Sequence, residues 1–78
     1  TVTDRYNEYV MTGLRTIWGV SKEKIAKEFG SSYANYLEHQ SDKFIEQQLL
    51  FWEDALLRTT KQGKFLADGI AADLFLLE

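Results

Sequence analysis

The first part of the chain repeats apolar residues with the spacing of an amphipathic helix. Apolar side chains recur at intervals of three and four residues, which places them on one helix face. Thr3 or Asp4 is a suitable N-cap before this stretch, and Gly19 tolerates the left-handed conformation that ends a helix. The pattern predicts a first helix that ends at Gly19. Its apolar positions are Tyr6, Val10, Leu14 and Ile17, widened by Tyr9, Met11 and Trp18.

Two further helices are expected after Gly19, with a tight turn between them. Residues 22–29 are typical of a short helix, with Ser21 as its N-cap and Gly30 at its end. A longer helix is expected over Tyr33–Gln48. Its expected caps are Ser31 and Ser32, and its apolar face comprises Tyr33, Leu37, Phe44 and Ile45, interrupted at Gln40 and Ser41.

Residues 49–59 have a different pattern. Leu50–Trp52 and Ala55–Thr59 are consistent with two short strands around the polar turn Glu53-Asp54. A two-stranded hairpin is marginal by itself, so it would have to pack on the helices. The alternative is that Leu49–Arg58 prolongs a helix.

The last segment has helical spacing again, and Thr60 is its expected N-cap. The run from Leu74 to Leu77 is apolar on more than one face, so part of it is expected to be exposed and to mark a missing partner surface. The apolar positions of this helix are Phe65, Leu66, Ile70, Leu74 and Leu77.

The predicted order of elements is helix, helix, helix, hairpin, helix. This order predicts a mainly α fold with a small β-hairpin, winged-helix-like, in which residues 22–48 form the helix-turn-helix element. A chain of 78 residues forms one domain at most. We therefore expect a single domain over residues 1–78, with no linker inside it.

Composition supports a folded domain and excludes several kinds of chemistry. Apolar residues make up 45% and aromatic residues 14% of the chain, which is enough for a packed core. Cysteine is absent, which excludes disulfides, thiolate nucleophiles and cysteine-ligated metals. The lack of cysteine fits a reducing compartment, and we expect a cytoplasmic protein without a membrane span. No catalytic residue and no metal site is expected.

The polar residues that could carry chemistry have simpler explanations. His39 is the only histidine, and with Asp42 alone it lacks the three or four ligands of a zinc site, so a surface position is expected. Glu38 and Asp42 lie four residues apart, which is more typical of a solvated helix face than of an acid–base pair. Ser31 and Ser32 are better explained as helix caps than as nucleophiles.

The charge pattern opposes nucleic-acid binding. The helix expected over Tyr33–Gln48 carries Glu38, Asp42 and Glu46 against Lys43 alone, and the turn beyond it is Glu53-Asp54. These carboxylates would repel phosphate. We therefore do not expect this helix-turn-helix outline to bind nucleic acid.

Several segments together resemble a known family. Glu8–Arg15 and Gly19–Ser21 resemble the start of the C-terminal domain in the oxygen-independent coproporphyrinogen III oxidase-like family, the HemN and HemW group. The helix end at Phe29-Gly30, the segment Leu49-Leu50 and the helix start Thr60–Gly63 fit the same pattern. The resemblance covers nearly the whole chain. Thr59 departs from the leucine that is usual there.

The resemblance implies the role of an accessory domain. Full-length relatives are radical S-adenosylmethionine (SAM) proteins whose N-terminal barrel holds a 4Fe–4S cluster through a Cys-x3-Cys-x2-Cys motif. The present chain would be the C-terminal fragment that packs on this barrel, without cofactors of its own, and helps to shape or cover a porphyrin or haem site. The true oxidase branch and the haem-transfer branch both stay open.

Arg15 is the one residue for which we expect a ligand contact, because its guanidinium could meet a porphyrin propionate. The alternative for Arg15 is a surface salt bridge with Glu8 or another neighbour. Two further functions stay open for the chain: a winged-helix nucleic-acid-binding domain, and a dimerisation module that uses the C-terminal helix.

Overall fold

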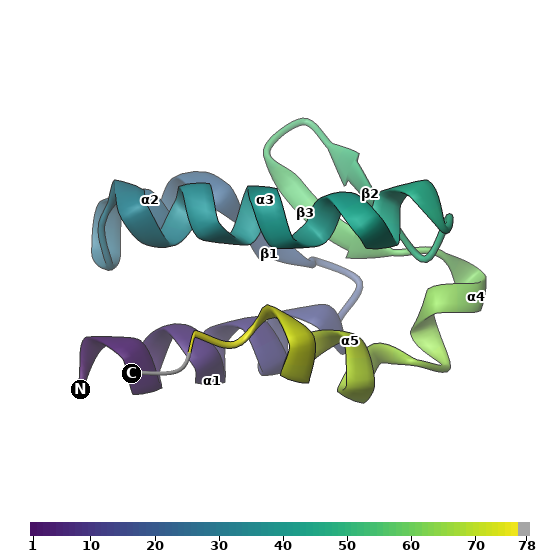
Figure 1. Cartoon of the computed structure of the whole chain (residues 1–78), viewed down its shortest axis with the longest axis horizontal. Helices are drawn as coiled ribbons and strands as arrows, with labels where there is room; N and C mark the ends of the chain where they lie inside the picture. Colours follow the sequence, from purple (N-terminus) through teal and green to yellow (C-terminus); the bar gives the residue numbers. More distant parts are fainter. Residues whose placement is uncertain (77–78) are drawn as a thin grey trace.

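The computed structural model describes residues 1–76, which form five helices and three short strands (Figure 1). Helices α1 and α5 lie side by side in one layer, and α2 and α3 form a second layer above them (Figure 1). The expected mainly helical fold with a small β-hairpin is confirmed. The elements are α1 (Val2–Leu14), β1 (Val20–Ser21), α2 (Lys22–Glu28), α3 (Ser31–Glu46), β2 (Leu50–Glu53), β3 (Leu56–Thr59), α4 (Lys61–Lys64) and α5 (Ala67–Leu74).

Helix α1 begins and ends earlier than the sequence pattern predicts. Its N-cap is Thr1, whose hydroxyl accepts a hydrogen bond from the backbone of Asp4 in a capping box, so neither Thr3 nor Asp4 is the cap. The helix ends at Leu14, and Thr3 is buried inside its first turn. The N-cap assignment from sequence was therefore wrong by two or three residues.

The segment after Leu14 corrects the prediction that the apolar face continues to residue 18. Ile17 is 65% exposed and Trp18 73% exposed. The Thr16 hydroxyl donates to the Gly13 carbonyl and accepts from the backbone N–H groups of Trp18 and Gly19, which turns the chain out of the helix. Gly19 has a left-handed φ of 76°, but it leads into β1 and is not the end of α1.

The start of α3 differs from the prediction, whereas the cap of α2 agrees with it. Ser21 caps α2 through a hydrogen bond from the Lys24 N–H. Helix α3 begins at Ser31, and its N-cap is Gly30, which offers no side chain. The expected caps, Ser31 and Ser32, lie within the first turn and are exposed.

The polar interruption of α3 does not break its buried face. Ser41 is fully buried. Burial of its hydroxyl is tolerated because the hydroxyl donates a hydrogen bond to the Glu38 carbonyl, one turn earlier in the same helix. The buried side of α3 therefore runs without a gap along its length. It comprises Ala34, Leu37, Ser41 and Phe44.

The hairpin is confirmed, and it belongs to a three-stranded antiparallel sheet. Leu50 pairs with Thr59 and Glu53 with Leu56, around a turn in which Asp54 has a φ of 56°. Strand β1 pairs with β3, which gives the order β1-β3-β2. The sequence did not predict β1, because a strand of two residues has no readable pattern. The name winged helix stays an interpretation of this order.

The predicted last helix is interrupted. Thr60 caps α4 as expected, by accepting from the Gly63 N–H. The chain then leaves the helix, and Phe65 and Leu66 are exposed between α4 and α5. The expectation that these two side chains face inward was wrong, because the turn that brings α5 onto α1 directs them outward.

The chain after α5 is held against the protein, so the described part of the apolar run is only partly exposed. Leu74 is fully buried, and Phe75 and Leu76 are half-buried against the core. The remaining residue of the run, Leu77, lies outside the described residues. Three polar side chains of α1 and α3 hold backbone atoms of this segment. They are Tyr6 (to Leu74 O, 3.0 Å), Tyr36 (to Phe75 O, 2.9 Å) and Asn7 (to Leu76 O, 3.1 Å, and from Leu76 N, 2.9 Å).

The buried Tyr6 gives the stability of the chain an expected dependence on alkaline pH. Burial raises the pKa of the Tyr6 phenol well above its usual range, and the charge of the nearby Tyr36 adds to the increase. The folded state therefore keeps its proton where the unfolded state loses it. This contribution to stability is complete below the unfolded pKa of about 10 and is lost as the pH rises above it.

We expect Tyr6→Phe to make the free energy of unfolding less dependent on pH above about 10, with a loss of about 1 kcal/mol at neutral pH from the missing hydrogen bond to Leu74. Urea unfolding at a series of pH values from neutral to alkaline measures both effects. An unchanged alkaline slope in the variant would contradict the assignment to Tyr6.

Candidate functional site

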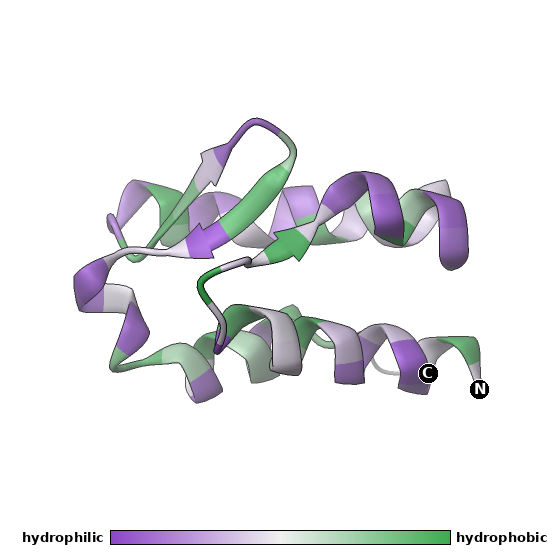
Figure 2. Ribbon diagram, turned by 180° about the vertical axis from the view of Figure 1, so that it is seen from behind, coloured by the Kyte–Doolittle hydropathy of each residue, from purple (hydrophilic) through white to green (hydrophobic). Residues whose placement is uncertain are grey.

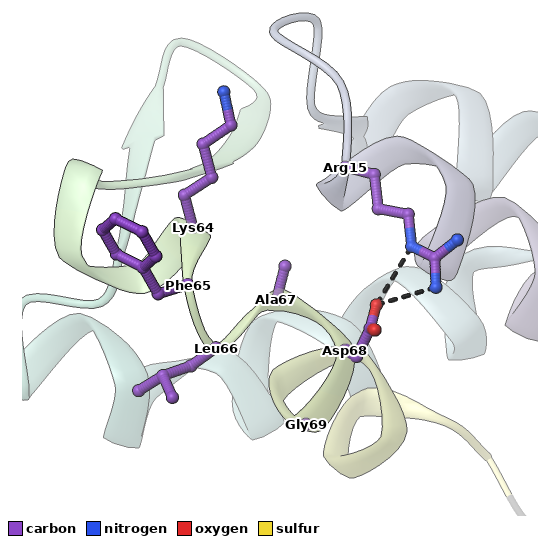
Figure 3. A pocket seen from close by; sticks show the side chains of 7 residues that line it. All are labelled: Arg15, Lys64, Phe65, Leu66, Ala67, Asp68 and Gly69. Atoms are coloured by element: carbon purple, nitrogen blue, oxygen red, sulfur yellow. Dashed lines mark hydrogen bonds and ion pairs between the residues drawn. The ribbon is translucent and has the colours of Figure 1, made fainter.

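A shallow hollow of about 430 Å³ lies where the end of α1 meets the connection between α4 and α5 (Figure 3). Arg15, the residue with an expected ligand contact, follows α1 directly and forms one side of the hollow. The α4–α5 connection forms the other side. The lining residues are Arg15, Lys64, Phe65, Leu66, Ala67, Asp68 and Gly69.

Within the hollow, Arg15 is engaged by a carboxylate. Its Nε and Nη2 atoms both donate to the same Asp68 oxygen, at 3.0 and 2.8 Å (Figure 3). Asp68 lies in the first turn of α5, where the helix dipole favours a negative charge. The salt bridge considered for Arg15 is thus present, with Asp68 and not with Glu8. Its contact with a propionate stays a prediction.

The Arg15–Asp68 pair is expected to contribute little to stability. Both side chains are more than half exposed, and exposed pairs typically contribute about 0–1 kcal/mol. Arg15→Ala should therefore change the free energy of urea unfolding by less than about 1 kcal/mol. A larger loss of unfolding free energy would show that Arg15 supports the fold. The presence of an exposed charge at this position would then be explained by stability and would not favour a role in binding.

A second hollow adjoins the first and shares Lys64 with it. It measures about 100 Å³ and contains Ile17 from the α1–β1 connection together with Arg58 from β3 and Lys61 from α4. The two hollows therefore join the α1–β1 and α4–α5 connections into one continuous surface.

Four of the large apolar side chains that the molecule exposes lie on these two connections. Phe65 is 86% exposed and Leu66 52%, in addition to Ile17 and Trp18. Figure 3 shows Phe65 and Leu66 directed to the side away from Arg15. We call this region the loop-end surface. It comprises Ile17, Trp18, Phe65 and Leu66 with Arg15, Arg58, Lys61, Lys64 and Asp68.

Sequence reasoning missed the loop-end surface because it assigned all four apolar residues to helix faces. A signal was present, since Ile17-Trp18 and Phe65-Leu66 are pairs of adjacent apolar residues. Neighbours in a helix are 100° apart, so an adjacent apolar pair is buried only where the apolar stripe is broad. Each pair lies beside a glycine or the end of a helix, where a turn is also available.

The residues considered for metal binding and catalysis lie elsewhere and apart. His39 and Asp42 are exposed on α3, which agrees with the surface position expected of His39. Glu38 forms an ion pair with Lys22 of α2. Residues 1–76 contain no group of three metal-ligating side chains.

The outer face of α3 carries the acidic side chains that the sequence placed on it. Glu38, Asp42 and Glu46 are exposed, and Lys43 is paired with Asp73 of α5. The hairpin turn adds Glu53 and Asp54, both exposed. The face that a helix-turn-helix protein would turn to DNA is therefore negatively charged, which opposes phosphate binding.

Fold and surface together define a small helical module without a metal cluster in its described part and with one exposed apolar surface. The model of the HemN C-terminal domain matches residues 1–66, and the chain belongs to this family. The resemblance seen in the sequence is thereby confirmed. No curated protein and no solved structure matches the chain.

The matched residues end at Leu66, so α5 lies beyond them although it packs on α1 and α3. Among the helices of residues 1–76, none has both the length and the apolar character to cross a membrane.

Proposed function

We propose that this chain is the non-catalytic C-terminal accessory domain of a radical SAM protein of the coproporphyrinogen III oxidase-like class. The match to the HemN C-terminal domain over residues 1–66 carries the proposal. In such a parent protein the domain packs on the N-terminal catalytic barrel and helps to shape or cover a porphyrin or haem site. The parent is a cytoplasmic oxidoreductase.

The cofactors of the parent belong to the barrel and not to this chain. A 4Fe–4S cluster of the radical SAM type is held by cysteines, and this chain has none. Its own residues therefore do not fit the cluster. What the domain contributes is surface, and the loop-end surface is the part of it that combines exposed apolar side chains with cations.

Arg15 is the residue proposed to contact the tetrapyrrole. Its guanidinium presents a planar set of donors that suits a carboxylate, as its contact with Asp68 illustrates. A propionate of the ligand would replace Asp68 in this contact. Because the pair is exposed, the exchange requires no repacking of the core.

The test compares the parent protein with and without residues 1–78 for oxidase turnover and for haem binding. We expect deletion to reduce at least one of the two. Arg15→Ala should weaken haem binding, whereas Arg5→Ala, which removes an arginine near the start of α1, should not. Unchanged turnover, haem binding and solubility of the truncated parent would refute the accessory role.

Two other functions have weaker support. The order of helices and hairpin favours a winged-helix nucleic-acid-binding domain, but the exposed carboxylates of α3 oppose it. Titration of labelled duplex DNA at two salt concentrations tests it, since salt-sensitive binding would revive it. A dimer through the C-terminal helix is opposed by the burial of Ile70, Ala71 and Leu74 inside the chain. A monomer mass in light scattering would exclude it.

A further inference from the structure

The loop-end surface differs in charge from the rest of the molecule. It holds four of the nine basic residues, Arg15, Arg58, Lys61 and Lys64, and one of the twelve acidic residues, Asp68. Five basic and eleven acidic residues remain for the rest of the chain. The residues of the surface are therefore positive by three charges, or by two when Glu53, the ion-pair partner of Arg58, is included, whereas the remainder is negative.

Two of the four cations of the loop-end surface, both lysines, have no ion-pair partner among the described residues. Arg15 pairs with Asp68, and Arg58 pairs with Glu53 of β2 at 2.6 Å. Lys61 and Lys64 form no ion pair with any of residues 1–76. Both belong to α4, which leads into the exposed Phe65 and Leu66. Exposed apolar side chains and two lysines that are unpaired within residues 1–76 therefore occur together at this end.

The same end lies away from the N-terminus. Figures 1 and 2 show the α1–β1 and α4–α5 connections toward the end of the long axis opposite to the start of α1. In Figure 2 both connections carry hydrophobic colour although they lie outside the helices. Four of the five large apolar side chains exposed among residues 1–76 therefore lie on connections toward this end, and the fifth is Val2.

We infer that the loop-end surface is the docking face of this domain, and that its occupant is a surface of the preceding catalytic barrel with an apolar centre and carboxylates at its rim. This inference rests on the proposed function, and it adds which end of the domain is covered and by what chemistry. Apolar contact supplies affinity, and the carboxylates opposite Lys61 and Lys64 fix the orientation.

Charge complementarity disfavours the other occupants. Two copies joined through this end would bring two positive surfaces together. Within residues 1–76, the negative remainder exposes only Val2 among large apolar side chains. An anionic membrane would meet two available lysines on a chain of net charge −3, which is a weak attraction. A protein surface with an apolar centre and carboxylates around it would complement both the apolar side chains and the lysines of the loop-end surface.

The experiment measures the accessibility of the surface in the intact parent protein. Phe65→Cys and Glu23→Cys place single thiols at exposed positions, one on the loop-end surface and one on α2. Maleimide labelling is followed by mass spectrometry of the corresponding peptides, normalised to the denatured protein. We expect the thiol at position 65 to react at least tenfold more slowly than the thiol at position 23. Equal rates would overturn the inference.

Charge reversal tests the carboxylate rim. Lys61→Glu with Lys64→Glu should speed labelling of the Phe65→Cys variant at least threefold, whereas the control Lys24→Glu with Lys27→Glu on α2 should not. No response to the first pair would overturn the acidic rim. Protection that disappears on dilution would assign the face to a second copy, and protection that requires phosphatidylserine vesicles would assign it to a membrane; either result overturns the inference.

These readouts are independent of the function test. Labelling reports whether the surface is covered, whatever the activity of the parent. The surface could be covered in a parent whose turnover and haem binding survive deletion of the domain. That result would support the docking face and refute the accessory role. If the surface is accessible in a parent that needs the domain, the docking face is refuted and the accessory role is supported.

Discussion

Gly63→Ala is expected to lower the free energy of unfolding by about 3 kcal/mol, at the upper end of the usual cost of overpacking. A Cβ at Gly63 would overlap the carbonyl oxygen of Leu49 and lie 2.7 Å from its carbon. The obstacle is backbone, which cannot rotate away as a side chain could. The same carbonyl accepts from the Thr60 N–H, so separating the two segments would also strain the cap of α4.

Gly69→Ala is the matched control, because nothing lies within 4 Å of a Cβ at this position in α5. Alanine is the better helix former by about 1 kcal/mol, so the control should stabilise the chain by up to that amount. Urea unfolding of both variants measures the two changes in the free energy of unfolding, which we expect to have opposite signs. A Gly63→Ala protein as stable as the wild type would show that α4 does not pack on Leu49 as described.

Leu74→Ala is expected to cost about 2–5 kcal/mol, the usual range for truncation of a buried leucine. Leu74 is fully buried at the end of α5, among residues of α1 and α3. A domain of this size has a total stability of about 4–12 kcal/mol, so the variant could be largely unfolded at physiological temperature. The midpoint of urea unfolding checks this expectation.

Leu66→Ala removes the same atoms from a side chain that is mostly in solvent. It should change stability by less than about 0.5 kcal/mol. The contrast also tests whether α5 belongs to the folding unit, since α5 lies beyond the residues that match the family. Equal costs at the two leucines would contradict the burial of α5.

The elements that the sequence predicted well are those with a long periodic pattern or a specific cap. Ser21 and Thr60 have side chains whose capping bonds need only their own neighbours, and both form these bonds. The hairpin was predictable because its two apolar strands flank a polar turn. Its turn residue Asp54 is among the few types that tolerate a positive φ.

The errors lie where tertiary contacts override local pattern. The spacing that placed Ile17 on the face of α1 is genuine, but the Thr16 hydroxyl ends the helix first. Strand β1 exists only because β3 is beside it. The loop-end surface was equally hidden, since a pattern of apolar residues does not tell which of them the turns will direct outward.

Polar side chains of α1 and α3 hold the backbone of residues 74–76, where α5 ends. Tyr6, Tyr36 and Asn7 bond to carbonyl oxygens and to one backbone N–H, so they recognise the main chain and not the side chains. Segments with other side chains could make the same backbone hydrogen bonds to Tyr6, Tyr36 and Asn7. Proline at position 76 is the exception, because it lacks the hydrogen that Asn7 accepts. The route of the backbone is thus set by polar side chains of α1 and α3, whereas the side chains of residues 74–76 are restricted by their packing on the core.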